Sequence, residues 1–390
     1  MIIFREKYLA ISLAFSGLIS ISPFFTYNHF GFYYISCLLM VMFFFLCKGL
    51  PLVARNDLIV SVILLIYIIF NYNYNIEQAK LSEFFILTIP FSIIFLLSGR
   101  TIRKLTTIYF VKIICFVLLI SLFFSFLLML GFQSLIPSYS FNAGDGLFTV
   151  YMFTVVRQGL EWNINGGLFH RFHSIFMEPG FVGTIAAFIV CAYKFNLKNK
   201  YCLIAFISGA ISTSFAFYVI VSLYLIIKHP LKGGIFLFLI INLLIYLNHP
   251  FINQLILDRF LNGGSQLDTR TSIYELGQIN VFYDWLFNGN IVDLIFGLGS
   301  EIPGSTGSYR YFLLSYGFLG VIVFSLLYFY LYFFDKVRIQ GFIIYDFIFI
   351  FLFVLSVYQR PYIDNYYMLL VFSTFIFSNE ILKKSFKNEI

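Results

Sequence analysis

The segment RFHSIFMEPG, residues 171–180, lies where a polar stretch of the sequence turns into a long apolar one. Pro179 has no amide hydrogen, its ring clashes with the carbonyl of Ile175, and it pushes Glu178 away from helical geometry. A helix must therefore begin or kink at Pro179. A start there leaves about 15 residues before Lys194, or about 22 Å, which is short for a bilayer core of ~30 Å.

Apolar runs surround this segment along the whole chain. The residues are 61% hydrophobic and 11% charged, and the mean hydropathy is +0.91, which is outside the range of soluble domains. Each run is roughly long enough to cross a bilayer as a helix. We therefore expect an all-α polytopic integral membrane protein with about twelve transmembrane helices and a single membrane domain over residues 1–390. The predicted spans are residues 8–25, 30–47, 57–70, 84–98, 105–130, 174–193, 201–213, 215–228, 234–248, 309–334, 341–357 and 366–380.

The charges predict the orientation of these spans. Arg5 and Lys7 precede the first run, which lacks a cleavage pattern and is interpreted as a retained helix. With this end in the cytoplasm, every inside connection, including the C-terminal tail, is short and basic. The two long connections, residues 131–173 and 249–308, fall outside. Both termini are thus expected to be cytoplasmic, with the functional face on the other side.

Arginine predominates over lysine on the outer side. The outer bases are Lys80, Arg157, Arg171, Arg259, Arg270, Arg310 and Arg360. The planar fork of arginine grips phosphate or carboxylate with two bonds and keeps its charge when desolvated. The skew therefore favours an anionic ligand. The alternative is that these arginines pair with loop acids such as Asp258, Asp268 and Asp293.

Glu178 and Arg171 form the leading candidate site. A carboxylate below the membrane surface should face the bundle interior or a wet cavity, with an arginine as its partner. If residues 171–177 are helical, Arg171 and Glu178 lie seven residues apart and point the same way. The alternative is a structural ion pair that fixes a kinked helix. His170 and His173 are read as hydrogen-bonding residues, with a catalytic role for His173 as a second interpretation.

The second long outer segment predicts an amphipathic helix over about residues 270–287, with Arg270, Tyr274, Val281 and Trp285 within its repeat. The glycines of FGLGSEIPGSTGS then supply a flexible link. Arg310 lies at the entry of the following span. The chain has two tryptophans, Trp162 and Trp285, both in the long outer segments. Their rings would stack on sugars or anchor the chain at the interface.

Several classes of function are disfavoured. The bases are scattered between helices, which argues against nucleic-acid binding. The cysteines, Cys37, Cys47, Cys115, Cys191 and Cys202, lie in or at the ends of apolar runs, which argues against a disulfide framework or a thiolate metal site. The sequence has no P-loop, no dinucleotide fingerprint, no Asp-x-Asp pair in an inside connection and no His/Cys metal spacing. We therefore expect neither a metal nor a soluble cofactor, and a donor delivered through the membrane.

The chain resembles the O-antigen polymerases of the Wzy type. The resemblance covers the architecture of nearly the whole chain, with RFHSIFMEPGFVGT before one span and TRTSIY and FGLGS before YRYFLLSYGFLG. Its sharpest motif is Arg-x-x-Ser-x-x-x-Glu-Pro, matched by Arg171, Ser174, Glu178 and Pro179. The late FGLG and the Gly317–Gly320 spacing add to it.

The resemblance implies a helical glycosyltransferase of GT-C-like design in the bacterial inner membrane, acting on the periplasmic side. It would transfer the growing glycan from undecaprenyl pyrophosphate to the terminal sugar hydroxyl of the next lipid-linked repeat unit. Its partners would be those lipid-linked oligosaccharides, membrane lipids, a flippase and a chain-length regulator. Arg171, Arg270 and Arg310 would stabilise the pyrophosphate, and Glu178 would act as the base, with His173 in reserve. The further substrate-binding candidates are Arg157, His170, Ser174 and Trp285.

Two other functions compete with this one. An O-antigen ligase would move finished glycan onto another acceptor, but such ligases usually rely on a histidine in the late loop, and the chain has no histidine after His249. A transporter or flippase of lipid-linked oligosaccharide would show two related halves with matching helix breaks. The break at residues 171–180 has no such partner in the late half.

Overall fold

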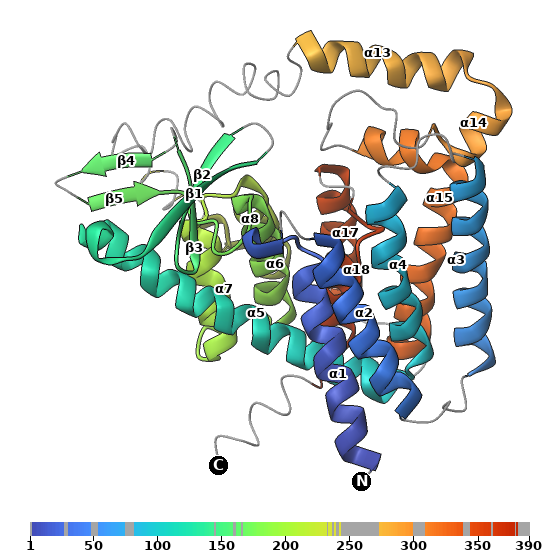
Figure 1. The fold of residues 1–390 in the computed structure, drawn as a ribbon, viewed down its shortest axis with the longest axis horizontal. Helices are drawn as coiled ribbons and strands as arrows, with labels where there is room; N and C mark the ends of the chain where they lie inside the picture. Colours follow the sequence, from blue (N-terminus) through green and yellow to red (C-terminus); the bar gives the residue numbers. More distant parts are fainter. Residues whose placement is uncertain are drawn as a thin grey trace. The chain divides into compact units, whose positions relative to one another are not determined.

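The computed structural model is mostly helical in the part of the chain that it describes (Figure 1). It describes residues 2–26, 30–47, 54–74, 82–143, 146–158, 161–164, 167–231, 233–235, 238, 242, 273–298, 309–337, 344–359, 362–378 and 380. Its helices are α1 (Ile2–Ile19), α2 (Phe30–Cys47), α3 (Arg55–Tyr74), α4 (Ser82–Leu97), α5 (Arg100–Met129), α6 (Pro179–Ala192), α7 (Lys200–Ile211), α8 (Phe215–Lys228), α13 (Ile273–Asn288), α14 (Ile291–Phe296), α15 (Tyr309–Tyr332), α17 (Ile344–Gln359) and α18 (Tyr366–Ile376). A helix lies at every predicted span except 234–248, which falls mostly outside the described residues.

Two helices in the described ranges are long and apolar enough to cross a membrane, Arg100–Met129 and Phe312–Val337. Several other apolar helices are shorter, among them α6, α7 and α8. The 14 residues of α6 correspond to about 21 Å, against a hydrocarbon core of ~30 Å. Membrane association therefore has support from these two helices, and the number of spans stays a prediction.

The prediction of an all-α fold is wrong for residues 131–173. This segment contains strands β1 (Ser138–Ala143), β2 (Gly146–Tyr151), β3 (Thr154–Arg157), β4 (Glu161–Ile164) and β5 (Gly167–His170). Strands β1, β2 and β3 form an antiparallel sheet, and β4 pairs with β5. In the sequence, Gly144-Asp145 lies between β1 and β2, and Asn165-Gly166 lies between β4 and β5. Such dipeptides are typical of tight hairpins.

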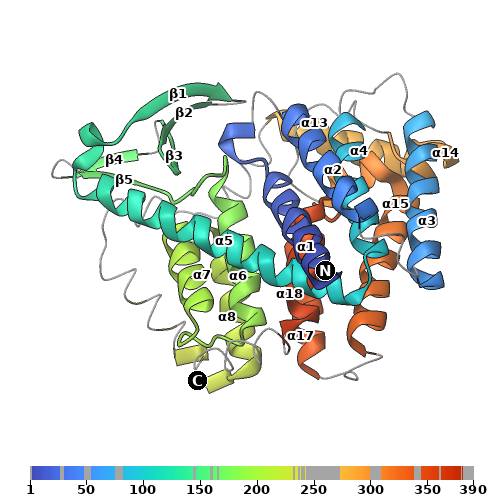
Figure 2. The same cartoon turned by 60° about the horizontal axis from the view of Figure 1, so that its bottom comes forward.

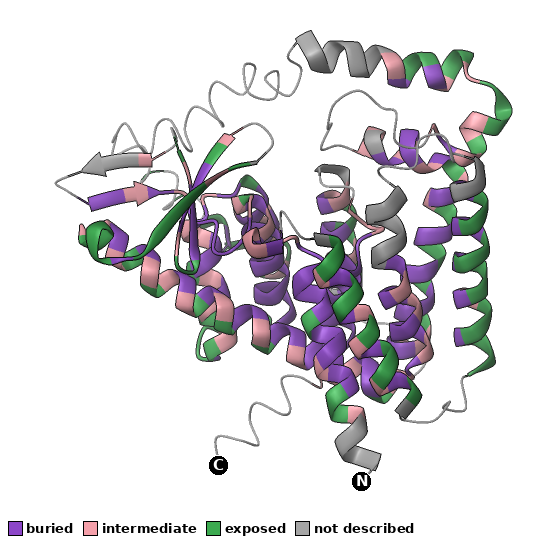
Figure 3. Ribbon diagram, viewed as in Figure 1, coloured by how far each residue is buried: buried purple, intermediate pink, exposed green. Residues whose placement is uncertain are grey.

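The chain divides into two compact units. Unit 1 comprises Met1–Leu13, Cys37–Thr106 and Arg259–Ile376, and unit 2 comprises Ala14–Ser36, Thr107–Asp258 and Phe377–Ile390. In unit 2, α7 and α8 pack against α6 (Figure 2). Nearly every residue of α6 is buried (Figure 3), as expected for a helix that is apolar on all sides.

The strands of unit 2 pack on the C-terminal half of α5. Leu128 of α5 shares a buried cluster with Val156 of β3 and Leu168 of β5. A second cluster joins Phe148 and Val155 within the three-stranded sheet. The sheet therefore positions the segment that follows β5, which leads directly into α6.

In unit 1, two glycines allow backbone to cross backbone. α14 ends at Gly297 (φ 84°), and Gly317 interrupts α15 with non-helical angles (φ 61°, ψ −174°). A Cβ atom on Gly297 would lie 2.5 Å from the carbonyl oxygen of Ser315 and 2.7 Å from the amide nitrogen of Gly317. The amide of Leu298 donates to the carbonyl oxygen of Leu314 at 2.6 Å. The FGLG and SYGFLG motifs thus meet in space, because neither glycine carries a side chain at the crossing.

Buried ion pairs join four helical segments of unit 1. Arg103 donates from Nε and Nη2 to the two carboxylate oxygens of Asp335, at 2.7 and 2.8 Å. Its Nη1 lies 3.2 Å from Asp57 Oδ1. The neighbouring Lys336 pairs with Asp346 at 2.8 Å. All five side chains are buried, so these charges satisfy one another inside the protein.

Candidate functional site

The start of α6 lies where the sequence predicts it. Pro179 is the first helical residue, and Glu178 precedes it in extended geometry (φ −123°, ψ 131°). This arrangement suits proline, since its missing amide hydrogen would have no helical partner at that position. The Glu178 side chain is exposed and makes no capping hydrogen bond to the helix. The expectation that Glu178 lies below the membrane surface, facing the bundle interior or a wet cavity, stays a prediction.

Arg171 is held by the turn between α7 and α8. Residues 171–178 form turns and extended backbone and no helix, so the prediction that helical spacing aligns Arg171 with Glu178 is wrong. Instead, the half-buried Arg171 donates from Nε to Thr213 Oγ1 at 3.0 Å and from Nη2 to the Thr213 carbonyl at 3.3 Å. These two bonds fix the direction of the guanidinium group at the edge of unit 2.

His170 and Ser174 are tied to α5 by buried hydroxyl groups. Ser174 Oγ donates to Ser121 Oγ at 2.8 Å, and His170 Nε2 lies 3.3 Å from Ser125 Oγ. Ser174 also adopts a left-handed backbone (φ 55°), which costs free energy for a serine and must be repaid by such contacts. Both residues are buried, and this position does not favour the predicted contact of His170 and Ser174 with substrate. Instead, the two side chains shape the loop that carries Arg171.

His173 is buried and neutral. Its Nδ1 lies 3.0 Å from the carbonyl oxygen of Met177, and since a carbonyl can only accept, this nitrogen carries the hydrogen. Burial, as the largest cause, lowers the pKa of His173 to about 3. The charges of Arg171, His170 and Arg157 contribute to the same lowering. Burial likewise lowers the pKa of His170 to about 4. An imidazole of this kind is a poor base at neutral pH, which argues against the reserve catalytic role of His173.

Arg157 is the second predicted arginine that the structure describes in unit 2. It ends β3, is half-buried, and its guanidinium lies 5.9 Å from the centre of the Phe148 ring. The charges of Arg157 and Arg171 both act on His173, so the two cations lie close to the same buried imidazole. We call these two half-buried arginines, together with the exposed Glu178 that precedes α6, the Arg171 site.

Unit 1 holds a third cation among aromatic rings. The Arg310 guanidinium lies 5.8, 5.8 and 5.7 Å from the ring centres of Phe282, Tyr283 and Tyr309. Within the described part of the chain, its buried Nε atom has no hydrogen-bond acceptor. Ring faces favour a cation but cannot accept its directional hydrogen bonds. Among the described residues, Arg310 is therefore held by ring faces and has one buried donor without an acceptor.

Trp285 does not present its ring for stacking on a sugar. The side chain is 4% exposed, and its Nε1 donates to the carbonyl oxygen of Asp293 at 3.1 Å. One ring face stacks on Phe318 at 5.9 Å, and the cluster around it includes Phe282 and Leu314. This burial does not favour the predicted contact of Trp285 with a substrate, which stays a prediction. Arg270, which was predicted in the same segment, lies outside the described residues, and the side chain of Trp162 in β4 is not described either.

Asp364 is a candidate that sequence reasoning missed. It lies between α17 and α18, and its Oδ2 accepts a hydrogen bond from the Tyr316 hydroxyl at 3.1 Å. Burial raises the pKa of this carboxyl group to about 6. The available signal was a single acid in a short connection between two apolar runs, because such a carboxylate is costly to desolvate.

The raised pKa of Asp364 makes stability depend on pH. Because the folded pKa of about 6 exceeds the ordinary value of 3.8, folding favours the protonated form; the contribution is complete below the unfolded pKa and is lost as pH rises through about 6. Asp364→Asn, which retains an acceptor for Tyr316, should therefore raise the unfolding free energy at pH 8 by about 1–3 kcal/mol. Thermal unfolding in detergent at pH 5 and pH 8 measures this. An equal shift in melting temperature at both pH values would contradict the assignment.

No protein-family model matches the chain, and no curated protein or solved structure matches it either. Among the described side chains, no three of the types His, Cys, Asp and Glu are grouped so as to hold a metal ion. What the described residues offer chemically is a set of arginines suited to an anion, together with the exposed carboxylate of Glu178 and the buried carboxylate of Asp364.

Proposed function

We propose that this chain is a surface-polysaccharide polymerase of the bacterial inner membrane. It would transfer the growing glycan from undecaprenyl pyrophosphate to the non-reducing-end hydroxyl of the next lipid-linked repeat unit, on the periplasmic face. The observation that carries the proposal is the Arg171 site, where two half-buried arginines lie close to His173, shortly before an apolar helix begins. The resemblance of residues 171–179 to O-antigen polymerases supports it, as do the two long apolar helices.

The reaction requires stabilisation of a departing anion. A bond forms between the acceptor hydroxyl oxygen and the anomeric carbon, and the bond from that carbon to the pyrophosphate oxygen breaks. Negative charge therefore develops on the lipid diphosphate, where fixed cations stabilise it best. Arg171 is suited to this because its Nε and Nη2 are held by Thr213 while the group remains half-exposed. The N-terminus of α6 adds a partial positive charge in the same region.

The proton of the attacking hydroxyl must pass to a base. Glu178 is the better candidate in unit 2, because it is exposed at the helix start, whereas His173 is buried and its pKa is lowered to about 3. Arg310 in unit 1 would bind a second anionic group of the lipid-linked substrates. None of these steps uses a nucleotide sugar.

Arg171→Ala tests the proposal. The variant should reach wild-type protein levels yet lower the rate of polymerisation about 100-fold, as removal of a single charge-stabilising donor does in other transfer reactions. Gel analysis of surface polysaccharide should then show single repeat units in place of long chains. Lys198→Ala is the matched control, because Lys198 is an exposed cation in the connection between α6 and α7. Long chains of normal length in the Arg171 variant would refute the proposal.

Deletion of the gene distinguishes the polymerase from a ligase. Loss of polymerisation leaves acceptors that carry one repeat unit, whereas loss of ligation leaves acceptors that carry none. Transport of labelled lipid-linked repeats across proteoliposomes by the purified protein would instead favour a flippase.

A further inference from the structure

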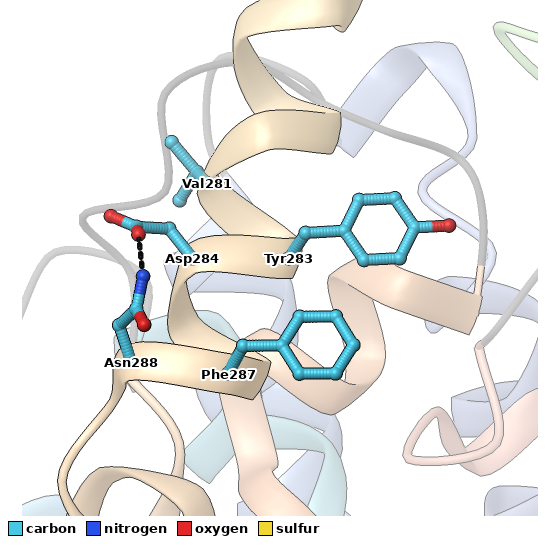
Figure 4. A pocket seen from close by; sticks show the side chains of 5 residues that line it. All are labelled: Val281, Tyr283, Asp284, Phe287 and Asn288. Carbon is cyan, nitrogen blue, oxygen red and sulfur yellow. Dashed lines mark hydrogen bonds between the residues drawn. The ribbon is translucent and has the colours of Figure 1, made fainter.

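A shallow hollow of about 430 Å³ lies over the exposed side of α13. It is lined by Val281, Tyr283, Asp284, Phe287 and Asn288 (Figure 4). This volume falls within the range of about 300–1,000 Å³ that is typical of small-ligand sites. None of these residues takes part in the Arg171 site, which belongs to unit 2.

The hollow combines two kinds of surface. The rings of Tyr283 and Phe287 stack in parallel, with centres 6.2 Å apart and planes 11° apart, and Phe287 remains 76% exposed. On the neighbouring face of the helix, Asn288 Nδ2 donates to Asp284 Oδ1 at 2.6 Å. The Asp284 carboxylate still has free acceptor positions, and so does the Asn288 carbonyl group. The site thus offers an apolar ring platform beside acceptors that require a donor.

This combination selects the chemistry of the ligand. A pyranose ring has an apolar face of C–H groups for the ring platform and hydroxyl groups that donate to carboxylate and amide oxygens. A phosphate is disfavoured inside the hollow itself, because the described lining carries the negative Asp284; the cation Arg310 lies over Tyr283 and is not part of that lining. A bilayer surface would use the rings but would leave the Asp284–Asn288 pair without a role.

We propose that the α13 hollow binds a sugar ring. Its assignment to a sugar of the lipid-linked substrate rests on the proposed function, whereas sugar binding itself does not. Arg310 supports this assignment, because its guanidinium lies over Tyr283, the same ring that lines the hollow. Tyr283 thus belongs to the ring platform and also contacts the cation Arg310, an arrangement that suits a sugar joined to a phosphate group.

Binding of soluble sugars to the full chain in lipid nanodiscs tests the proposal. The probes are the methyl glycosides of glucose, galactose and N-acetylglucosamine, followed by saturation-transfer NMR. In a Trp162→Phe background, Trp285 is the remaining tryptophan and reports on α13 by its fluorescence. At least one glycoside should bind and change the emission. Phe287→Ala and Asp284→Ala should each weaken its binding about tenfold, and Phe287→Trp should restore it.

Phe329→Ala is the matched control. Phe329 of α15 is 62% exposed and stacks on Phe333 at 6.1 Å, but the groove beside it is lined by apolar residues and Tyr330. This variant should bind the glycosides like wild type. The proposal is overturned if no glycoside binds. It is also overturned if the α13 variants bind the glycosides as wild type does but associate less with lipid, since the rings would then contact the bilayer instead of a sugar. Because the assay involves no polymerisation, normal polysaccharide in the Arg171 variant would refute the proposed function and leave sugar binding standing.

Discussion

Arg103→Ala should lower the free energy of unfolding by about 3–5 kcal/mol, because it removes the cation from between two buried carboxylates. Arg103 makes two short bonds to Asp335 and a third contact to Asp57. Its Nη1 also donates to the Leu96 carbonyl, and Tyr330 donates to Asp57. Without the guanidinium, two like charges would face each other away from water, and the Leu96 carbonyl would lose a donor.

Chemical unfolding in detergent micelles, followed by circular dichroism, measures this loss. Lys112→Ala is the control on the same helix, because Lys112 is exposed, and it should change the free energy by less than about 1 kcal/mol. The triple variant Arg103→Met/Asp57→Asn/Asp335→Asn should recover much of the loss, since it leaves no uncompensated charge. If Arg103→Ala has the same free energy of unfolding as Lys112→Ala, the buried ion pairs contribute nothing to stability.

Gly317→Ala should destabilise unit 1 by about 3 kcal/mol or more. The backbone at Gly317 (φ 61°, ψ −174°) lies in a region that is essentially limited to glycine. A Cβ atom there would also overlap the carbonyl of Ile295 and lie 2.6 Å from the amide nitrogen of Gly297. Both obstacles are backbone atoms, which cannot rotate away as a side-chain terminus can.

Gly31→Ala is the matched control for this substitution. Gly31 lies in α2, and among the described residues no atom beyond its chain neighbours and its own helix backbone lies within 4 Å of the position that a Cβ would take. Alanine there should be neutral or stabilising by up to about 1 kcal/mol, because it favours helix. The comparison is made by thermal unfolding of both variants. Equal melting temperatures for the two would mean that α14 and α15 do not cross closely.

The helices could be predicted from the sequence because their signals are local. Proline at position 179 fixes the start of α6, and the amphipathic repeat over 270–287 corresponds to α13. The strands were missed because the segment was classed by polarity alone. The Asn165-Gly166 pair and the alternating pattern around it were a usable hairpin signal.

The environment of individual side chains could not be predicted in the same way. Arg103 and Asp335 are 232 residues apart in sequence, and no local pattern links them. Trp285 was read as exposed because it lies in a long polar segment, yet α14 and α15 fold back and cover its ring. For Arg171 the residue type was informative, but its direction depends on Thr213, which belongs to a different connection.

The bond between Leu298 and Leu314 joins the residue that follows Gly297 to α15, and residues 299–308 lie between these two points in the sequence. Insertions or deletions within that stretch should therefore leave α14 and α15 in register. Related proteins would be expected to vary in length there while retaining glycine at the positions of Gly297 and Gly317. Evolution could thus lengthen or shorten the connection between α14 and α15 at little cost to these helices.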